Sequence, residues 1–179
     1  MALKLCVPHQ CRCGTQVDFF GQQFLVCKPA PGRTVRHRHL NEVIARSLAS
    51  ASVPVSKEPS GLSRSDGKLP DGLTLIPRRA GRSLIWDVTV SCATADSYLE
   101  ASSREAVAAA ELAASNKVVK YAGLSSQGEF VQIAVESHGP INMDALQFLS
   151  VGQAIGGDDQ GCSSIFVFVS TDFRRDATI

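Results

Sequence analysis

The sequence predicts an α/β (α+β) fold in which helices flank a mixed central sheet. Three observations predict it. Helix and strand patterns alternate along the chain, two neighbouring strand patterns are joined by a short turn, and 44% of the 179 residues are apolar. That apolar fraction is enough for one core, and the length suggests one domain with a small appendage. Four of the six cysteines lie in the first 27 residues, so we divide the chain into a Cys-rich segment, 1–32, and a domain, 33–179.

Three helices are expected. In residues 33–51 the apolar side chains recur on one helical face and the charged ones on the opposite face (Leu40, Val43, Ile44 and Leu48 against Arg38, Glu42 and Arg46), which predicts an amphipathic helix. Residues 100–124 are alanine-rich and predict one long helix that stops near Gly123. Residues 142–155 predict the third.

Four strands are expected, over residues 53–57, 72–76, 83–91 and 129–136. The second and third are joined by the short segment "PRRAG", so we expect an antiparallel hairpin. The tail 163–175 has local strand propensity but could equally form a terminal helix.

Composition and charge bear on whether the chain binds nucleic acid, spans a membrane or is secreted. The net charge of +1 gives no overall electrostatic case for nucleic acid. Two local basic clusters, however, are either solvated surface or phosphate contacts: Arg33, Arg36, His37 and Arg38, and Lys68, Arg78, Arg79 and Arg82. No apolar run is long enough to span a membrane, and the N-terminus lacks a signal-peptide core. We therefore expect an intracellular chain, in which crowded cysteines favour metal binding over disulfides.

Two aspartates stand in apolar strands. Leu84, Trp86 and Val88 alternate with Ile85 and Asp87 along one strand, so the aspartate faces away from the main core. Asp71 stands at the entrance of the preceding strand. Paired strands could bring the two carboxylates close together, where they would repel unless a cation lay between them. Mg²⁺, or Mn²⁺, suits such a pair of oxygen ligands.

The helix expected over residues 100–124 carries two lysines that could lie near the two aspartates. Lys117 shares a helical face with Ala110, Ala114 and Tyr121, which is the face expected to pack on the sheet, and Lys120 flanks it. Two acids and a lysine around a metal are typical of phosphodiester cleavage. The alternative is structural: Asp71 serves a turn, Asp87 pairs with an arginine, and the lysines extend over the surface.

The ordered motifs resemble a known family. P-D at 70–71, D-V-T at 87–89 and K-x-x-K-Y at 117–121, together with "GRTVRHRHLNEVI" and "AVESHGP", are similar to the restriction-like endonuclease domain of non-LTR retrotransposon reverse transcriptases. That domain is a diverged branch of the PD-(D/E)XK nucleases. The resemblance covers about Cys11 to Gly156. Leu69 and Arg78 depart from the family pattern and mark a divergent or fragmentary copy.

The resemblance implies roles for single residues. Asp71 and Asp87 match the metal-binding acids, Lys117 with Lys120 the helical lysine, and Glu58 a glutamate that assists the metal or fixes a loop. His37 matches a family histidine, which is either a hydrogen-bonded core residue or part of the site. The implied fold is restriction-endonuclease-like.

The resemblance also implies a zinc knuckle in which Cys11, Cys13 and Cys27 are ligands. Gln23 stands at the position of the family's histidine, and glutamine is a poor zinc ligand. Cys6, His9, His37 or His39 could complete the tetrahedron. The alternative is a metal-free cluster of thiols.

Three functions follow as expectations. The first is a Mg²⁺-dependent DNA endonuclease of retrotransposon origin, located in the nucleus if DNA is its substrate, with DNA and a reverse transcriptase chain or domain as partners and no membrane. The second is a catalytically inactive nucleic-acid-binding or interaction module with the same fold. The third is a small zinc-binding scaffold.

Overall fold

The chain forms a four-stranded mixed sheet covered by helices on both faces. The computed structural model describes residues 4, 6–27, 29, 31–62, 67–77, 80–124, 126–137 and 139–155. The strand order is β3-β4-β5-β6. The strands are β3 (Val55–Lys57), β4 (Gly72–Thr74), β5 (Leu84–Ser91) and β6 (Glu129–Glu136). The first three pair antiparallel and β6 runs parallel to β5, which confirms the mixed sheet and the predicted hairpin.

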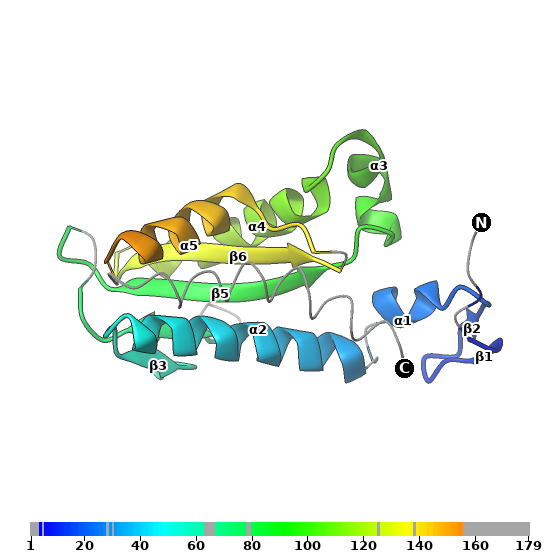
Figure 1. Ribbon diagram of the computed structural model, residues 1–179, viewed down its shortest axis with the longest axis horizontal. Coiled ribbons are helices and arrows are strands. Elements are labelled where there is room, and N and C mark those ends of the chain that lie inside the picture. The colour runs from blue at the N-terminus through cyan, green and yellow to red at the C-terminus, as the bar shows by residue number, and fades with distance from the viewer. Residues whose placement is uncertain are drawn as a thin grey trace.

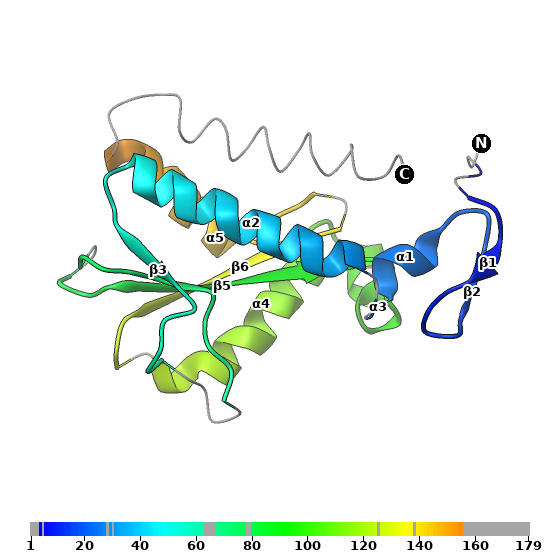
Figure 2. The ribbon, with the colours of Figure 1, turned by 90° about the horizontal axis from the view of Figure 1, so that it is seen from below.

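Helices cover the two faces of the sheet unequally. Helices α2 (Pro31–Ser50) and α5 (Met143–Ile155) lie on one face, and α4 (Ala108–Tyr121) lies on the other (Figure 2). The larger core is on the α2 side, where Trp86, Val88 and Ile133 pack against Leu40 and Ile44. On the α4 side alanines of the helix pack on Ala134, so α4 lies close to the sheet. Both faces of β5 are therefore buried.

The prediction of one helix over 100–124 is wrong. The segment contains α3 (Asp96–Arg104), α4 and a short 3-10 turn η1 (Ala122–Leu124). Glu105 is extended and Val107 has φ 72, a left-handed conformation that interrupts the helix. The carboxylate of Glu136 explains where α4 begins, because its Oε1 accepts the backbone N–H groups of Ala109 and Ala110 at 3.1 and 3.3 Å.

The Cys-rich segment has regular structure that its sequence did not suggest. It contains β1 (His9–Gln10), β2 (Gln16–Val17) and α1 (Gln22–Val26), and it lies beyond the N-terminal end of α2, next to neither α4 nor α5 (Figure 1). Helix α2 begins at Pro31, so its first residues belong to the segment that we numbered 1–32. The predicted tail at 163–175 lies outside the described residues. Among the helices that are described, none combines the length and apolar character that crossing a membrane requires.

We predict that Gly72→Ala destabilises the fold by about 1–3 kcal/mol. A Cβ at Gly72 would meet Cζ2 of Trp86 at 1.9 Å, and that indole is completely buried in the core. The measurement is the urea midpoint of unfolding. Gly123→Ala is the matched control, since a Cβ there meets nothing within 4 Å. Equal midpoints for the two variants would contradict the packing argument.

Candidate functional site

Asp87 is a buried carboxylate with two partners from α4. It is 4% exposed in the middle of β5. Its Oδ2 accepts a hydrogen bond from Lys117 Nζ at 2.8 Å and its Oδ1 one from the hydroxyl of Tyr121 at 2.8 Å. The same hydroxyl lies 3.2 Å from the carbonyl oxygen of Leu69. Both oxygens of Asp87 are thus bonded, which offsets the cost of burying the charge.

The side chain of Asp71 bonds to the backbone of β5 just beyond the point where pairing with β4 stops. Gly72 is the first residue of β4 and pairs with Trp86, so Val88, two residues further along β5, has no β4 partner. Asp71 Oδ2 accepts the Val88 N–H at 2.6 Å. His37 Nε2, from α2, lies 3.1 Å from the Val88 carbonyl oxygen and 3.1 Å from Asp71 Oδ2. Asp71 is therefore bonded to Val88, the residue of β5 that follows Asp87.

The imidazole of His37 responds to both acids. Its hydrogen bond to Asp71 raises its pKa above the usual value, partial burial opposes the shift, and the negative charges of Asp71 and Asp87 add to it. His37 is therefore a hydrogen-bonded histidine whose ring nitrogen contacts both the Asp71 carboxylate and the backbone of β5 at Val88.

Some predicted site residues do not reach these acids. Lys120 is exposed, one turn beyond Lys117. Glu58 is exposed with φ 46, and its backbone N–H donates to the Asp71 carbonyl at 3.0 Å. Within the described ranges, Glu58, Asp71 and Asp87 do not form a group whose ligand atoms all lie within 4.8 Å of one another. Of the two expected roles of Glu58, assisting the metal or fixing a loop, its backbone contact with Asp71 favours the second.

The sequence analysis missed Gln132. It lies beside Asp87 in the parallel register, and its Nε2 donates to the carbonyl of Asp87 at 2.8 Å and to Thr89 Oγ1 at 3.1 Å. Its Oε1 is buried and has no hydrogen-bond partner among the described atoms. A polar residue inside the apolar strand "EFVQIAVE" was the available signal. Asn41 was missed as well: its Oδ1 accepts the indole N–H of Trp86 at 3.0 Å.

The second candidate site is a cluster of three thiols in the N-terminal segment. The sulfur atoms of Cys11, Cys13 and Cys27 all lie within 4.8 Å of one another. Around a tetrahedral zinc with bonds of about 2.3 Å, thiolate sulfurs are about 3.8 Å apart, so the cluster could hold a metal ion and is compatible with zinc. Gln23 Nε2 donates to Cys13 Sγ at 3.2 Å, so the amide lies next to the cluster.

None of the other proposed zinc ligands belongs to this group. Cys6 Sγ donates to the Asp18 carbonyl at 3.1 Å, and His9 Nδ1 lies 2.9 Å from the Val7 carbonyl. His37 and His39 are on α2 and are not members of the group. None of these four residues is placed beside the three thiols in this structure, and the side chains of Cys6 and His9 contact backbone carbonyls instead.

The three thiols differ in acidity. Hydrogen bonds from Thr15 and then from Cys11 lower the pKa of Cys13 to about 6. Burial, followed by the neighbouring thiols, raises the pKa of Cys27 to about 11. A metal ion requires all three as thiolates, so its binding would release protons.

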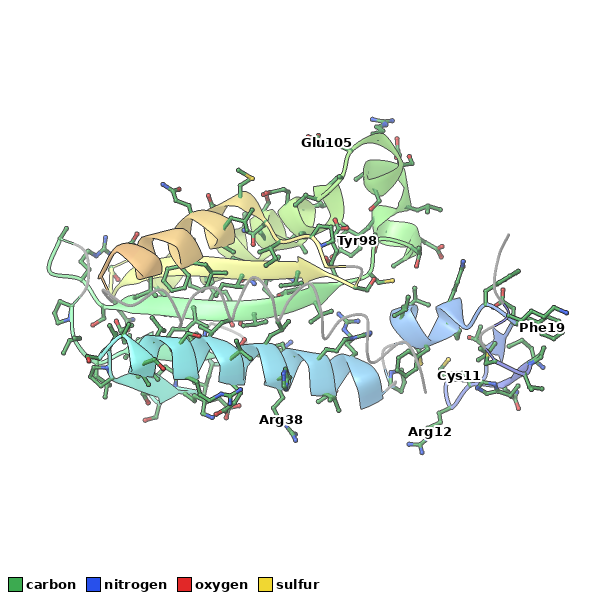
Figure 3. The ribbon with its side chains drawn as sticks, viewed as in Figure 1. Cys11, Arg12, Phe19, Arg38, Tyr98 and Glu105 are labelled. Atoms are coloured by element: carbon green, nitrogen blue, oxygen red, sulfur yellow. The ribbon has the colours of Figure 1, made fainter. Side chains whose placement is uncertain are left out.

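The basic residues lie mostly away from the acids. Arg33 and Arg38 are exposed on α2, and Arg38 points away from the sheet, as Arg12 does in the N-terminal segment (Figure 3). Arg36 lies against Phe24, with Cζ 5.7 Å from the ring centroid. Arg82 donates to the Gly128 carbonyl at 2.8 Å, and Lys68 is exposed. Arg78 and Arg79 lie outside the described residues.

Comparison with known proteins adds no family assignment. No protein-family model matches the chain, and the search of curated proteins found no significant match. The functional argument therefore depends on the geometry of the two candidate sites.

We predict that His37→Gln lowers the free energy of unfolding more near pH 6 than near pH 9. A raised pKa in the folded state means that the stabilisation is fully present below the unfolded value, about 6.5, and is lost as the pH rises through the folded value. Urea unfolding at both pH values measures it. In an Asp71→Asn background the pH-dependent part should disappear; an effect of the same size there would assign it to another group.

We predict that the purified chain binds about one zinc ion and that Cys27→Ala abolishes the binding. Cys6→Ser, in the same segment but outside the cluster, should keep it. Gln23→His should tighten binding, because imidazole is a better ligand than an amide. The measurement is titration against a chromophoric zinc chelator. Zinc retained by Cys27→Ala, or lost in Cys6→Ser, would contradict the assigned ligands.

Proposed function

We propose that the chain is a Mg²⁺-dependent endonuclease domain that cleaves phosphodiester bonds in DNA. One observation carries the proposal: a lysine from α4 lies 2.8 Å from the carboxylate of Asp87, while Asp71 is bonded to the very next residue of β5. Lys117 and Asp71 thus bond to two adjacent residues of β5, Asp87 and Val88. The same residues carry the resemblance to the retrotransposon nucleases.

The oxygen donors fit a hard divalent cation. Asp71 and Asp87 would supply carboxylate oxygens, and the Val88 carbonyl faces the same open edge of β5. Mg²⁺ prefers such oxygens and accepts few protein ligands alongside water and phosphate. When bound, the cation would polarise a phosphoryl oxygen and lower the pKa of a water molecule.

Lys117 is suited to act on the scissile phosphate. Its ammonium carries three hydrogens, and the bond to Asp87 uses one. The side chain is 29% exposed, so the ammonium is accessible from solvent while Asp87 holds its position. Tyr121 fixes the other oxygen of Asp87, which keeps the carboxylate oriented. A positioned cation of this kind stabilises the charge that develops on a phosphate during cleavage.

The uneven charge of the chain supports a nucleic-acid substrate. Residues 1–41 contain a single acid, Asp18, whereas their basic residues are Lys4, Arg12, Lys28, Arg33, Arg36 and Arg38. The rest of the chain has more acids than bases. Contacts from such a region to phosphates would position DNA without reading its sequence. Retrotransposon origin, a reverse transcriptase partner and a nuclear location belong to this proposal through the resemblance alone.

A second candidate is a catalytically inactive nucleic-acid-binding module. It is favoured by the fact that Asp87 already has Lys117 and Tyr121 as partners and Asp71 has His37 and Val88. Such a polar cluster is satisfied without a metal, so the fold could persist after activity is lost.

We predict that the protein nicks supercoiled plasmid in Mg²⁺ or Mn²⁺ and that Asp87→Asn lowers the rate by at least about 100-fold. Lys117→Ala should have a similar effect. Lys120→Ala is the matched control, because this exposed lysine lies one turn further along the helix; its rate should stay close to that of the unchanged protein. Circular dichroism checks that each variant is folded. Equal traces of nicking for the unchanged protein and Asp87→Asn would favour the inactive module.

A further inference from the structure

One nitrogen atom stands between two oxygens of the proposed metal site. His37 Nε2 lies 3.1 Å from Asp71 Oδ2 and 3.1 Å from the carbonyl oxygen of Val88. The position arises from the shape of the sheet: β4 begins at Gly72, opposite Trp86, so the backbone of Val88 is left at an open edge. Asp71 bonds its N–H and His37 bonds its carbonyl.

The geometry determines where the imidazole carries its hydrogen. A carboxylate oxygen accepts, and so does a carbonyl oxygen. Since both atoms near Nε2 are acceptors, Nε2 must be the donor, with its hydrogen directed at the pair of oxygens. This holds for the neutral ring and for the charged ring alike.

We infer that the imidazole of His37 and a divalent cation are alternative occupants of the position between Asp71 Oδ2 and the Val88 carbonyl oxygen. The inference depends on the proposed function, which puts a cation at Asp71 and Asp87. A Mg²⁺ ion bonds to oxygen at about 2.0–2.1 Å, which is close to the distance at which a hydrogen-bonded hydrogen lies from its acceptor. A cation held by both oxygens would therefore take the place of the hydrogen on Nε2, and the ring has to move away.

The surroundings allow that movement. The side chain of His37 is 39% exposed, against 12% for Asp71, so the ring can turn towards solvent without opening the core. Helix α2 does not depend on His37 for its position. Asn41, one turn further along, accepts the indole N–H of Trp86 at 3.0 Å, and Leu40 and Ile44 are buried in the core.

Binding of Mn²⁺ to the full chain tests the inference. Isothermal titration calorimetry on zinc-saturated protein should show tighter binding to His37→Ala than to the unchanged protein, by about tenfold if His37 occupies the position about 90% of the time. His39→Ala, two residues along the same helix, is the matched control and should leave the affinity unchanged. Equal or weaker binding to His37→Ala would overturn the inference.

A second measurement follows the imidazole of His37 in the unchanged protein. In long-range ¹H–¹⁵N spectra of the unchanged protein, Mg²⁺ should shift the side-chain nitrogen signals of His37, identified by their absence from His37→Gln. Signals that stay in place while Mg²⁺ binds would overturn the inference.

Asp87→Asn separates this failure from that of the proposed function. If the unchanged protein and His37→Ala bind Mn²⁺ equally and Asp87→Asn does not bind it, the metal site stands and the competition by His37 is disproved. If no variant binds Mn²⁺, both proposals fail.

Discussion

The burial of one carboxylate, Asp87, shapes much of this structure. β5 is covered on both faces, and a charge in its centre is tolerable only when each oxygen has a partner. Lys117 and Tyr121 provide these partners from α4, so the helix must lie in one register on the sheet. Alanines at the contact let it approach closely, and Glu136 binds its first N–H groups. The same contacts therefore fix both the position of the candidate site and the packing of α4 on the sheet.

The short length of β4 creates the rest of the site. β4 begins at Gly72, which leaves room for the indole of Trp86 where a Cβ would clash. Because β4 does not extend past Gly72, the backbone N–H and carbonyl of Val88 are left to bond with Asp71 and His37. An acid, a histidine and the Val88 carbonyl thus collect at an edge next to Asp87. The backbone groups at a strand edge need hydrogen-bond partners, and here the partners are a carboxylate and an imidazole.

The N-terminal segment is organised by a separate set of contacts. Its short strands and α1 bring Cys11 and Cys13 to Cys27, and among the residues of this segment that the structure describes, only Val17 and Cys27 are buried apolar side chains. A bound metal would supply the missing stabilisation, as it does in other small metal-binding units. The aromatic contact between Arg36 and Phe24 links this segment to α2, which also carries His37.

The sequence by itself determined the first and last helices of the domain, the four strands of its sheet, the hairpin, the core face of β5 and the meeting of Asp87 with Lys117, because these follow from the spacing of apolar and polar residues along the chain. Only the tertiary structure decided the break before α4, the roles of Tyr121, Gln132 and Glu136, and the exclusion of Lys120 and Glu58. Each of these depends on contacts between residues far apart in the chain. His37 shows the difference best: its helical face was predictable, but its two oxygen partners exist only because the pairing of β4 with β5 stops at Trp86, two residues before Val88.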